Sequence, residues 1–337
     1  MILTRCPENP IVRPGKFPWR RATTYNPAAI VDDGTFYLLE RASPSLRPHQ
    51  CWIGLLKSDD GVHFEHVVDE PVFTPGQMGW PLGSVQDPRV VKIDGTFYMT
   101  YAVRPFSIHF GQPAGFRLEN CYEHYHGPED NYTRSAIAVS RDLVHWEHLA
   151  FCTPEGVDDR DVILFPEKIG GRFALLRRPQ TGPYAEGPPS IYVSYSDDLA
   201  EWSQPRRIAS PQPGAKWEAG KIGGSCPPVR TEAGWLTAYH GVDAETVYRV
   251  GMMLLDLNDP TRVLARTRIP VLEPHAEYEK LGLVIPNVVF PCGNVVHEGT
   301  YYLYYGCCDT CIAMASAPLD DLLEYVLIGG GGDVSAD

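Results

Sequence analysis

One aspartate in this 337-residue chain has a setting that suggests chemistry. Asp87 precedes a proline and leads into an apolar run, so we expect an extended backbone and a carboxylate that enters the interior. A buried carboxylate needs a partner or a catalytic task. The alternative is that Asp87 is a turn residue that caps the entry to a strand.

Basic residues are scarce, yet several of them occupy strand-like positions. Arg134 opens an apolar run, Arg177 and Arg178 end another, and Lys221 begins a third. Arginine binds phosphate with two parallel hydrogen bonds and lysine adds a point charge, so three converging cations would form an anion site. Each one alone is more typical of a surface ion pair, and spacing does not show that they converge.

Further polar residues lie at the ends of strand-like runs, where they could hydrogen-bond to sugar hydroxyls. They are Asn26, Arg41, His240 and Asp309. For His240, a histidine satisfied within the core is an equal alternative.

Two groups of residues have spacings that superficially resemble metal ligands. His109, His124 and His126 share one segment but lack a well-spaced further ligand, and the three cysteines of 307–311 lack a partner pair. We therefore expect no metal, and we expect these cysteines to behave as small buried apolar residues.

Composition excludes several classes of protein. The net charge of −13 argues against a nucleic-acid groove and against binding to an anionic membrane. No apolar run is long enough to span a bilayer, and the first residues lack the apolar segment of a signal peptide. Nine irregularly spaced cysteines indicate reduced thiols, so a cytoplasmic location is expected.

Internal repetition predicts the fold. A glycine-containing turn followed by aromatic and β-branched residues recurs at intervals of 61 to 76 residues. A second motif, in which a Ser and an Asp precede an aromatic residue, follows three of these turns. The turns begin at Asp33, Asp94, Gly170, Ala233 and Glu298, and the second motif begins at Ser58, Ser140 and Ser196.

Five such units predict an all-β protein, a five-bladed β-propeller with four strands per blade. A β-sandwich is the alternative, but it would not produce five similar units. We expect one catalytic propeller domain over 1–328, in which 105–132 is a long insertion that acts as a lid or an oligomer contact. Residues 329–337, rich in glycine, are expected to form a flexible tail.

Six segments, spread in order over nearly the whole chain, carry a family resemblance. They are NPAAI (26–30), SVQDPRVVKIDGTFYMTY (84–101), DVILFPEKIGGRFALLRRP (161–179), WEAGKIGGSCPPVRTEAGWLTAYHGV (217–242), PNVVFPCG (286–293) and YYLYYGCCDT (301–310). They resemble glycoside hydrolase family 130, the β-mannoside phosphorylases and mannosidases. The family's fold is a five-bladed propeller, which agrees with the repeat count.

The resemblance implies an inverting glycoside phosphorylase. Such an enzyme cleaves β-mannosidic bonds of manno-oligosaccharides or mannosyl-glycosides with inorganic phosphate and releases α-mannose 1-phosphate. It makes Asp87 the general acid, acting through the 3-hydroxyl of the bound mannose. Gln86 stands where the family usually has Glu, which leaves the acid intact and is expected to alter its local field.

The resemblance also assigns binding residues. Phosphate is already an anionic nucleophile, so the second carboxylate of an inverting hydrolase is not needed. The family's hydrolases replace the phosphate-binding cations with glutamates, so the cations kept here favour phosphorolysis. The implied phosphate ligands are Arg134, Arg178 (or its neighbour Arg177) and Lys221, and the implied mannose ligands are Asn26, Arg41, Arg89, His240 and Asp309.

Two other functions remain open at this point: a β-mannosidase on the same fold, and a non-catalytic carbohydrate-binding propeller. No cofactor is expected beyond phosphate as co-substrate, and a homo-oligomer is one expectation because family members often assemble. The linkage, β-1,2 or β-1,4, and the acceptor sugar are not decided by these residues.

Overall fold

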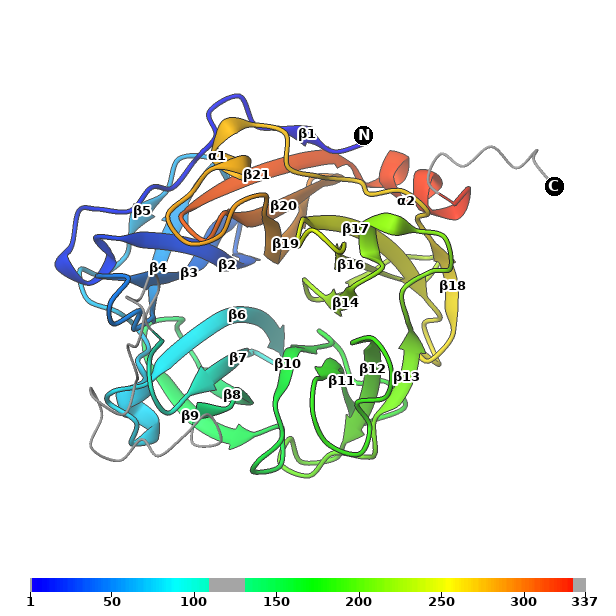
Figure 1. The fold of residues 1–337 in the computed structure, drawn as a ribbon, viewed down its shortest axis with the longest axis horizontal. Coiled ribbons are helices and arrows are strands. Elements are labelled where there is room, and N and C mark those ends of the chain that lie inside the picture. Colours follow the sequence, from blue (N-terminus) through cyan, green and yellow to red (C-terminus); the bar gives the residue numbers. More distant parts are fainter. Residues whose placement is uncertain (1, 109–130, 330–337) are drawn as a thin grey trace.

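The computed structural model describes residues 2–108 and 131–329. It is built mainly of antiparallel strands in five sheets that surround a central axis (Figure 1). The fold is therefore the predicted five-bladed β-propeller.

The strands follow the chain blade by blade. The first blade contains β2 (Thr23–Asp32), β3 (Thr35–Ser43), β4 (Trp52–Ser58) and β5 (Glu65–His66). The second contains β6 (Ser84–Ile93), β7 (Thr96–Arg104), β8 (Arg134–Ser140) and β9 (Trp146–Phe151). The third contains β10 (Asp159–Leu164), β11 (Phe173–Pro179), β12 (Ile191–Ser196) and β13 (Arg206–Ala209).

The last two blades depart from this simple order. The fourth contains β14 (Lys221–Gly224), β16 (Trp235–Val242), β17 (Tyr248–Leu255) and β18 (Val263–Arg266), with β15 (Val229–Arg230) also paired to β16. The fifth contains β19 (Val289–His297), β20 (Thr300–Cys307), β21 (Cys311–Pro318) and β1 (Thr4–Arg5). The helices are α1 (Glu277–Lys280) and α2 (Leu319–Leu327), with short 3-10 turns that include η1 (Pro18–Arg20), η2 (Pro75–Met78) and η5 (Lys216–Glu218).

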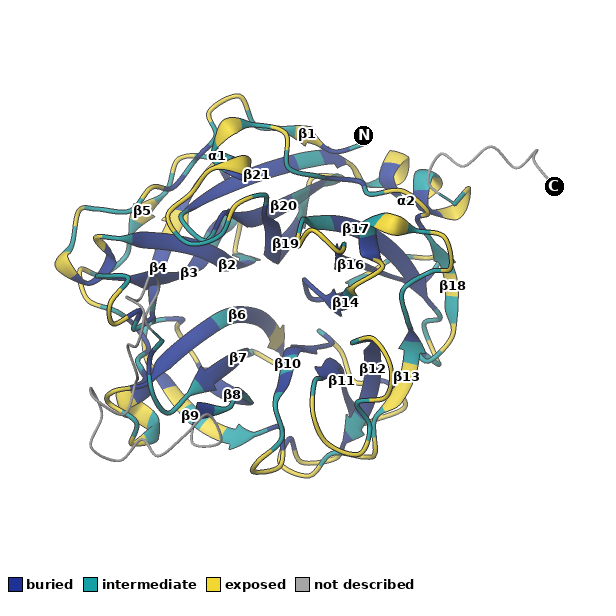
Figure 2. Ribbon diagram, in the orientation of Figure 1, coloured by how far each residue is buried: buried dark blue, intermediate teal, exposed yellow. Residues whose placement is uncertain are grey.

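The first strand of each blade lies next to the axis, and these strands are largely buried (Figure 2). Each predicted turn connects two paired strands of its blade. In four blades that turn joins the innermost strand to the second one, and in the fourth blade it joins β15 to β16. Positive φ angles at Gly34 (80°) and Gly95 (74°) explain why the turns need glycine.

The second sequence motif forms a side-chain-closed turn between the third and the outermost strand of a blade. The Ser140 hydroxyl accepts the backbone N–H of Leu143 at 3.0 Å, and an Asp142 carboxylate oxygen accepts the N–H of His145 at 2.8 Å. The same bonds recur at Ser58 with Asp60 and at Ser196 with Asp198. Local hydrogen bonding therefore explains why these residues repeat.

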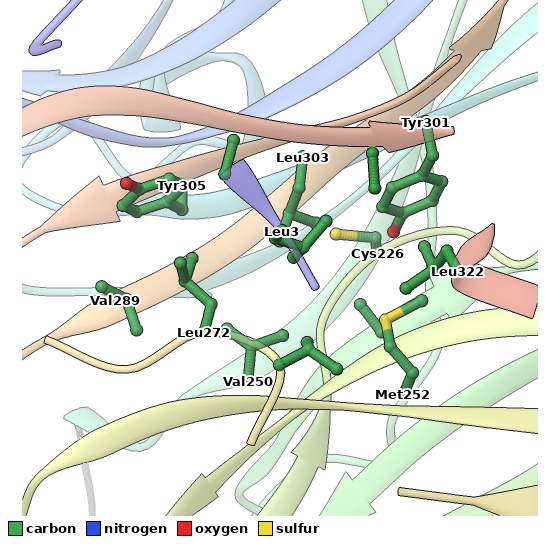
Figure 3. Packing of buried hydrophobic residues seen from close by; sticks show 14 of the residues in the cluster. Leu3, Cys226, Val250, Met252, Leu272, Val289, Tyr301, Leu303, Tyr305 and Leu322 are labelled. Carbon is green, nitrogen blue, oxygen red and sulfur yellow. The ribbon is translucent and has the colours of Figure 1, made fainter. Parts of the chain in front are cut away.

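The ring is closed by the two ends of the described chain, because β1 pairs with β21. Arg5 of β1 donates hydrogen bonds at 2.8 Å to both carboxylate oxygens of the buried Glu279. Beside this joint, a hydrophobic cluster fills the space between the fourth and fifth blades (Figure 3). The cluster includes Leu3, Cys226, Val250, Met252, Leu272, Val289, Tyr301, Leu303, Tyr305 and Leu322. β1 therefore forms the outermost strand of the fifth blade, and its pairing joins the start of the described chain to the last blade and closes the ring.

Some predictions fall on residues outside the described ranges. These are most of the insertion 105–132, with the three histidines His109, His124 and His126, and nearly all of the tail 329–337. The domain assignment and the lid or contact role therefore stay predictions. Among the described residues, the cysteines are all free thiols, and no helix has the length and apolar character to cross a membrane.

Candidate active site

A cavity of about 200 Å³ lies at the axis and is lined by residues from all five blades. Most of the predicted site residues meet there, although they are far apart in the sequence. The polar lining comprises Asn26, Arg41, Gln86, Asp87, Arg104, Arg160, Asp161, Arg178, Lys221, His240, Tyr248 and Asp309. Three carboxylates and a larger number of basic groups thus face one small space.

A repeated backbone feature aims three of these side chains. Asn26, Asp87 and Asp161 have φ angles of 45°, 50° and 52°, and each lies where the register of an innermost strand shifts against the second strand. Such bulges redirect a side chain, and Asn and Asp tolerate positive φ better than most residues. The axial end of three blades therefore presents an amide or a carboxylate to the cavity.

Asp87 is held by donors from the first blade. One of its carboxylate oxygens accepts a hydrogen bond from Asn26 Nδ2 at 2.8 Å and another from Arg41 Nη1 at 2.8 Å. Arg89 donates to the backbone carbonyl of Asp87 at 2.9 Å. Burial alone would raise the pKa of Asp87, but the charges of Arg41 and Arg89 and the Asn26 amide hold it below its usual value.

Asp309 has the opposite electrostatics. It lies in the turn between β20 and β21, with a φ of 51°. Burial and the charge of Asp87 outweigh the attraction of Arg41 and raise the pKa of Asp309 to about 6. Asp309 therefore holds a proton more readily than Asp87 does.

The cations gather on the side formed by the third and fourth blades. Arg160 and Arg178 are direct cross-strand partners in β10 and β11, an arrangement of like charges that needs compensation. Arg160 forms two hydrogen bonds of 2.8 Å with Asp158, and Arg178 Nε donates to Asp161 at 2.5 Å. The carboxylates thus compensate the two guanidinium groups in part.

Lys221 is the third cation of this set. Its ammonium group donates to the Tyr248 hydroxyl at 2.9 Å. Burial, with repulsion from Arg178 and Arg160, lowers the pKa of Lys221 to about 8. A bound anion would relieve this repulsion, so the arrangement suits phosphate.

Asp161 organises the centre of this cation set, and the sequence analysis did not identify it. It accepts hydrogen bonds from Arg178 and from Arg89 Nη2 at 3.4 Å, and its Oδ2 lies 3.6 Å from His240 Nε2. A side chain at Gly223 would overlap Asp161, Arg178 and His240, so glycine is needed at this position. Burial and the neighbouring cations lower the pKa of His240 to about 3, so the imidazole is neutral at physiological pH.

Three polar atoms of the cavity are buried and have no hydrogen-bond partner among the described residues. They are Asn26 Oδ1, Arg178 Nη1 and His240 Nε2. Buried polar atoms are nearly always paired in folded proteins. A polar ligand that supplied both donors and acceptors would satisfy this set.

Arg134 is not part of the cavity, although it was expected beside Arg178 and Lys221. It lies on β8, the third strand from the axis, where its guanidinium stacks 3.7 Å from the Phe151 ring centroid and donates to the Thr153 carbonyl at 2.9 Å. Arg160, on an innermost strand, takes the expected place among the cations.

The structure distinguishes Arg178 from its neighbour Arg177, and it places Arg89 outside the cavity lining. Arg178 lines the axial cavity, whereas Arg177 lines a separate hollow of about 560 Å³ and is paired with Asp159. Arg89 does not line the cavity, because its guanidinium is used by Ser225, Asp87 and Asp161. Arg89 therefore holds other residues of the site in place and does not line the space that a sugar would enter.

The sequence contained a signal for Asp161. Asn26 and Asp87 each lie seven residues before the turn residues Asp33 and Asp94, and Asp161 lies nine before Gly170. Aligning the repeats would have found it. Arg160 was harder to identify, because it follows two aspartates and so resembles an ordinary ion-pair partner.

Comparison with known proteins assigns the chain to a family. The sequence model of glycoside hydrolase family 130, described as beta-1,4-mannooligosaccharide phosphorylase, matches residues 5–118 and 116–327. The chain belongs to this family, as the resemblance predicted.

Individual relatives agree with this assignment. The chain is 37% identical to a 1,2-beta-oligomannan phosphorylase of Thermoanaerobacter sp. (strain X514) over 95% of this chain and 98% of the relative. It is 28% identical to a beta-1,4-mannooligosaccharide phosphorylase of Ruminococcus albus over 96% and 91%. The solved structure of a beta-1,2-mannobiose phosphorylase from Listeria innocua superposes with a TM-score of 0.76 at 26% identity, covering 97% of this chain and all of that one (100%).

The charge state of Lys221 predicts a pH dependence of anion binding. Inorganic phosphate should bind with full affinity while Lys221 is protonated and more weakly as the pH rises through about 8. Lys221→Arg, which keeps its charge over this range, should remove that decline. Isothermal titration calorimetry with phosphate between pH 6.5 and about 9.5 measures this. An equal decline in both proteins would contradict the assignment of Lys221.

Proposed function

We propose that this protein is an inverting β-mannoside phosphorylase. It would use inorganic phosphate to cleave β-mannosidic bonds of manno-oligosaccharides or mannosyl-glycosides and release α-mannose 1-phosphate. The observation that carries the proposal is the pairing of one donor-bound aspartate, Asp87, with three cations, Arg160, Arg178 and Lys221, around one cavity. Family membership and the phosphorylase names of the relatives support it.

In this proposal the cations bind phosphate and Asp87 is the general acid. A phosphate oxygen attacks the anomeric carbon, and a new C–O bond forms as the glycosidic C–O bond breaks. Asp87 delivers a proton to the leaving oxygen through the sugar 3-hydroxyl, and the proton that phosphate gives up balances the one delivered. Phosphate and sugar would raise the pKa of Asp87 by adding negative charge and excluding water.

The other cavity residues have binding roles in this proposal. Asn26, Arg41, His240 and Asp309 would hydrogen-bond to the mannose, and Arg89 would hold Asp87 in place. Asn26 Oδ1 and His240 Nε2, which have no partner within the described ranges, are available for sugar hydroxyls. No step of this scheme uses a metal ion or an organic cofactor. Assembly into a homo-oligomer is a separate part of the proposal.

The electrostatics of Asp161 argue against its use as the base of a hydrolase. An inverting hydrolase needs a base that activates water across the sugar. Asp161 lies among the cations, but it is bound by Arg178 and Arg89, which lower its pKa and weaken it as a base. Phosphate, which brings its own negative charge, needs no such base.

Asp87→Asn should lower the rate of phosphorolysis by about 10²- to 10⁴-fold, because the amide cannot donate the acid's proton. Release of mannose 1-phosphate from mannobiose, followed with a coupled assay, measures it. Asp309→Asn serves as the comparison, with a raised KM for the sugar as its main defect. Product release in wild type that is equally fast without phosphate would favour a β-mannosidase, and sugar binding without turnover would favour a non-catalytic propeller.

Arg160 and Arg134 can be distinguished by matched variants. Arg160→Gln should raise the KM for phosphate about 10- to 100-fold, the effect of losing a charge-assisted hydrogen bond. Arg134→Gln should leave this KM within about twofold, since Arg134 lies outside the cavity. Initial rates at varied phosphate and saturating mannoside measure both. The reverse ranking would restore Arg134 to the phosphate site.

For the linkage, we infer β-1,2, because the relative at 37% identity is a β-1,2 enzyme, whereas the β-1,4 relative is 28% identical. The protein should therefore transfer mannose from mannose 1-phosphate to mannose and form a β-1,2 bond. Glucose and N-acetylglucosamine are the comparison acceptors, and NMR of the product identifies the bond. A β-1,4 product would overturn this inference without affecting phosphorolysis itself.

A further inference from the structure

Arg41 is shared between the proposed acid and a buried cysteine. Its Nη1 atom donates to Asp87 at 2.8 Å, and its Nε atom donates to Cys51 Sγ at 3.3 Å. The guanidinium also lies over the ring of Tyr25, 4.5 Å from the centroid. The Arg41 side chain is buried and contacts Asp87, Cys51 and Tyr25. Its positive charge is therefore shared between two acceptors, the carboxylate of Asp87 and the sulfur of Cys51.

The surroundings of Cys51 are polar although no part of the residue is exposed (0%). The two ring nitrogens of His49 lie 3.8 and 3.9 Å from Sγ, and the Tyr25 hydroxyl lies 3.8 Å from it. The backbone N–H of Cys51 donates to the Ser84 hydroxyl at 3.1 Å. The sulfur is therefore surrounded by polar groups, one of which is the guanidinium of Arg41.

The ionisable groups that interact with Cys51 come from four parts of the chain. They are Tyr25 on β2, Arg41 on β3, His49 before β4 and Asp309 in the turn after β20. Asp87 lies on the other side of Arg41. Arg41 and His49 outweigh the cost of burial and lower the pKa of Cys51 to about 6.

Two other buried cysteines near the axis behave differently. Burial raises the pKa of Cys226 and of Cys292, against the attraction of Arg89. Within residues 2–108 and 131–329, neither sulfur receives an arginine hydrogen bond like the one that Arg41 gives Cys51. Cys51 therefore ionises more readily than these two cysteines.

We propose that Cys51 is a positioning residue whose thiolate binds one side of Arg41 and so limits how strongly Arg41 holds the carboxylate of Asp87. The proposal rests on the proposed function, in which Asp87 must take up and release a proton. With the thiolate removed, the full charge of Arg41 acts on Asp87 and stabilises its ionised form. The acid is then protonated over a smaller range of pH.

The test is the pH profile of phosphorolysis in Cys51→Ser and Cys51→Ala. At saturating substrates, both variants should move the alkaline limb of kcat down by roughly one pH unit, the size expected for one lost buried charge across a guanidinium. Serine keeps the size and the hydrogen-bond acceptor of cysteine but stays neutral. A purely structural role would thus be rescued by serine, and a wild-type profile in Cys51→Ser would overturn the proposal.

A matched control and a second measurement keep the result clear. Cys152→Ser replaces another buried thiol, which lines the separate hollow, and should keep the wild-type profile. The thiolate itself is measured from ultraviolet absorbance, as a step near pH 6 present in wild type and Cys152→Ser but absent in Cys51→Ser. If wild type lacks that step, the proposal fails. This titration needs no activity, so its failure is separate from a failure of phosphorolysis.

Discussion

Repulsion among Arg160, Arg178 and Lys221 is the interaction on which the candidate site depends. Three positive groups of this kind, held in one partly buried space, favour the entry of a compact anion and lower the pKa of the lysine. Asp161 compensates only part of this charge, since its carboxylate is shared between Arg178 and Arg89. The fold must therefore hold the cations in place, and the closed ring does so.

The propeller solves this positioning problem with one repeated device. A bulge in an innermost strand turns an Asn or Asp side chain toward the axis in three successive blades, at Asn26, Asp87 and Asp161. The bulge in each blade has a different use. In the proposed mechanism the first of these residues supports the general acid and the second is the general acid, while the third binds the surrounding cations. The pKa values of Asp87 and Asp309 shift in opposite directions because Asn26 and Arg41 donate hydrogen bonds to Asp87.

The differences between expectation and structure have simple geometric causes. Arg177 and Arg178 are neighbours, so their side chains leave opposite faces of β11, and only the second of them faces the axis. Arg134 is the first residue of β8 and Arg160 the second residue of β10, but these are the third and the first strand of their blades. Distance from the axis decides whether an arginine reaches the cavity, and a linear motif does not contain that distance.

The sequence by itself determined the number of blades, because each repeat carries turn residues that local backbone geometry requires. It also identified the family and most of the polar residues of the cavity. Only the tertiary structure decided which of them meet, because ring closure places residues from all blades in one space. The hydrogen bonds of Arg41, the contacts of Asp161 and the presence of Arg160 in the cavity lining depend on contacts between different strands. Local sequence cannot specify such contacts.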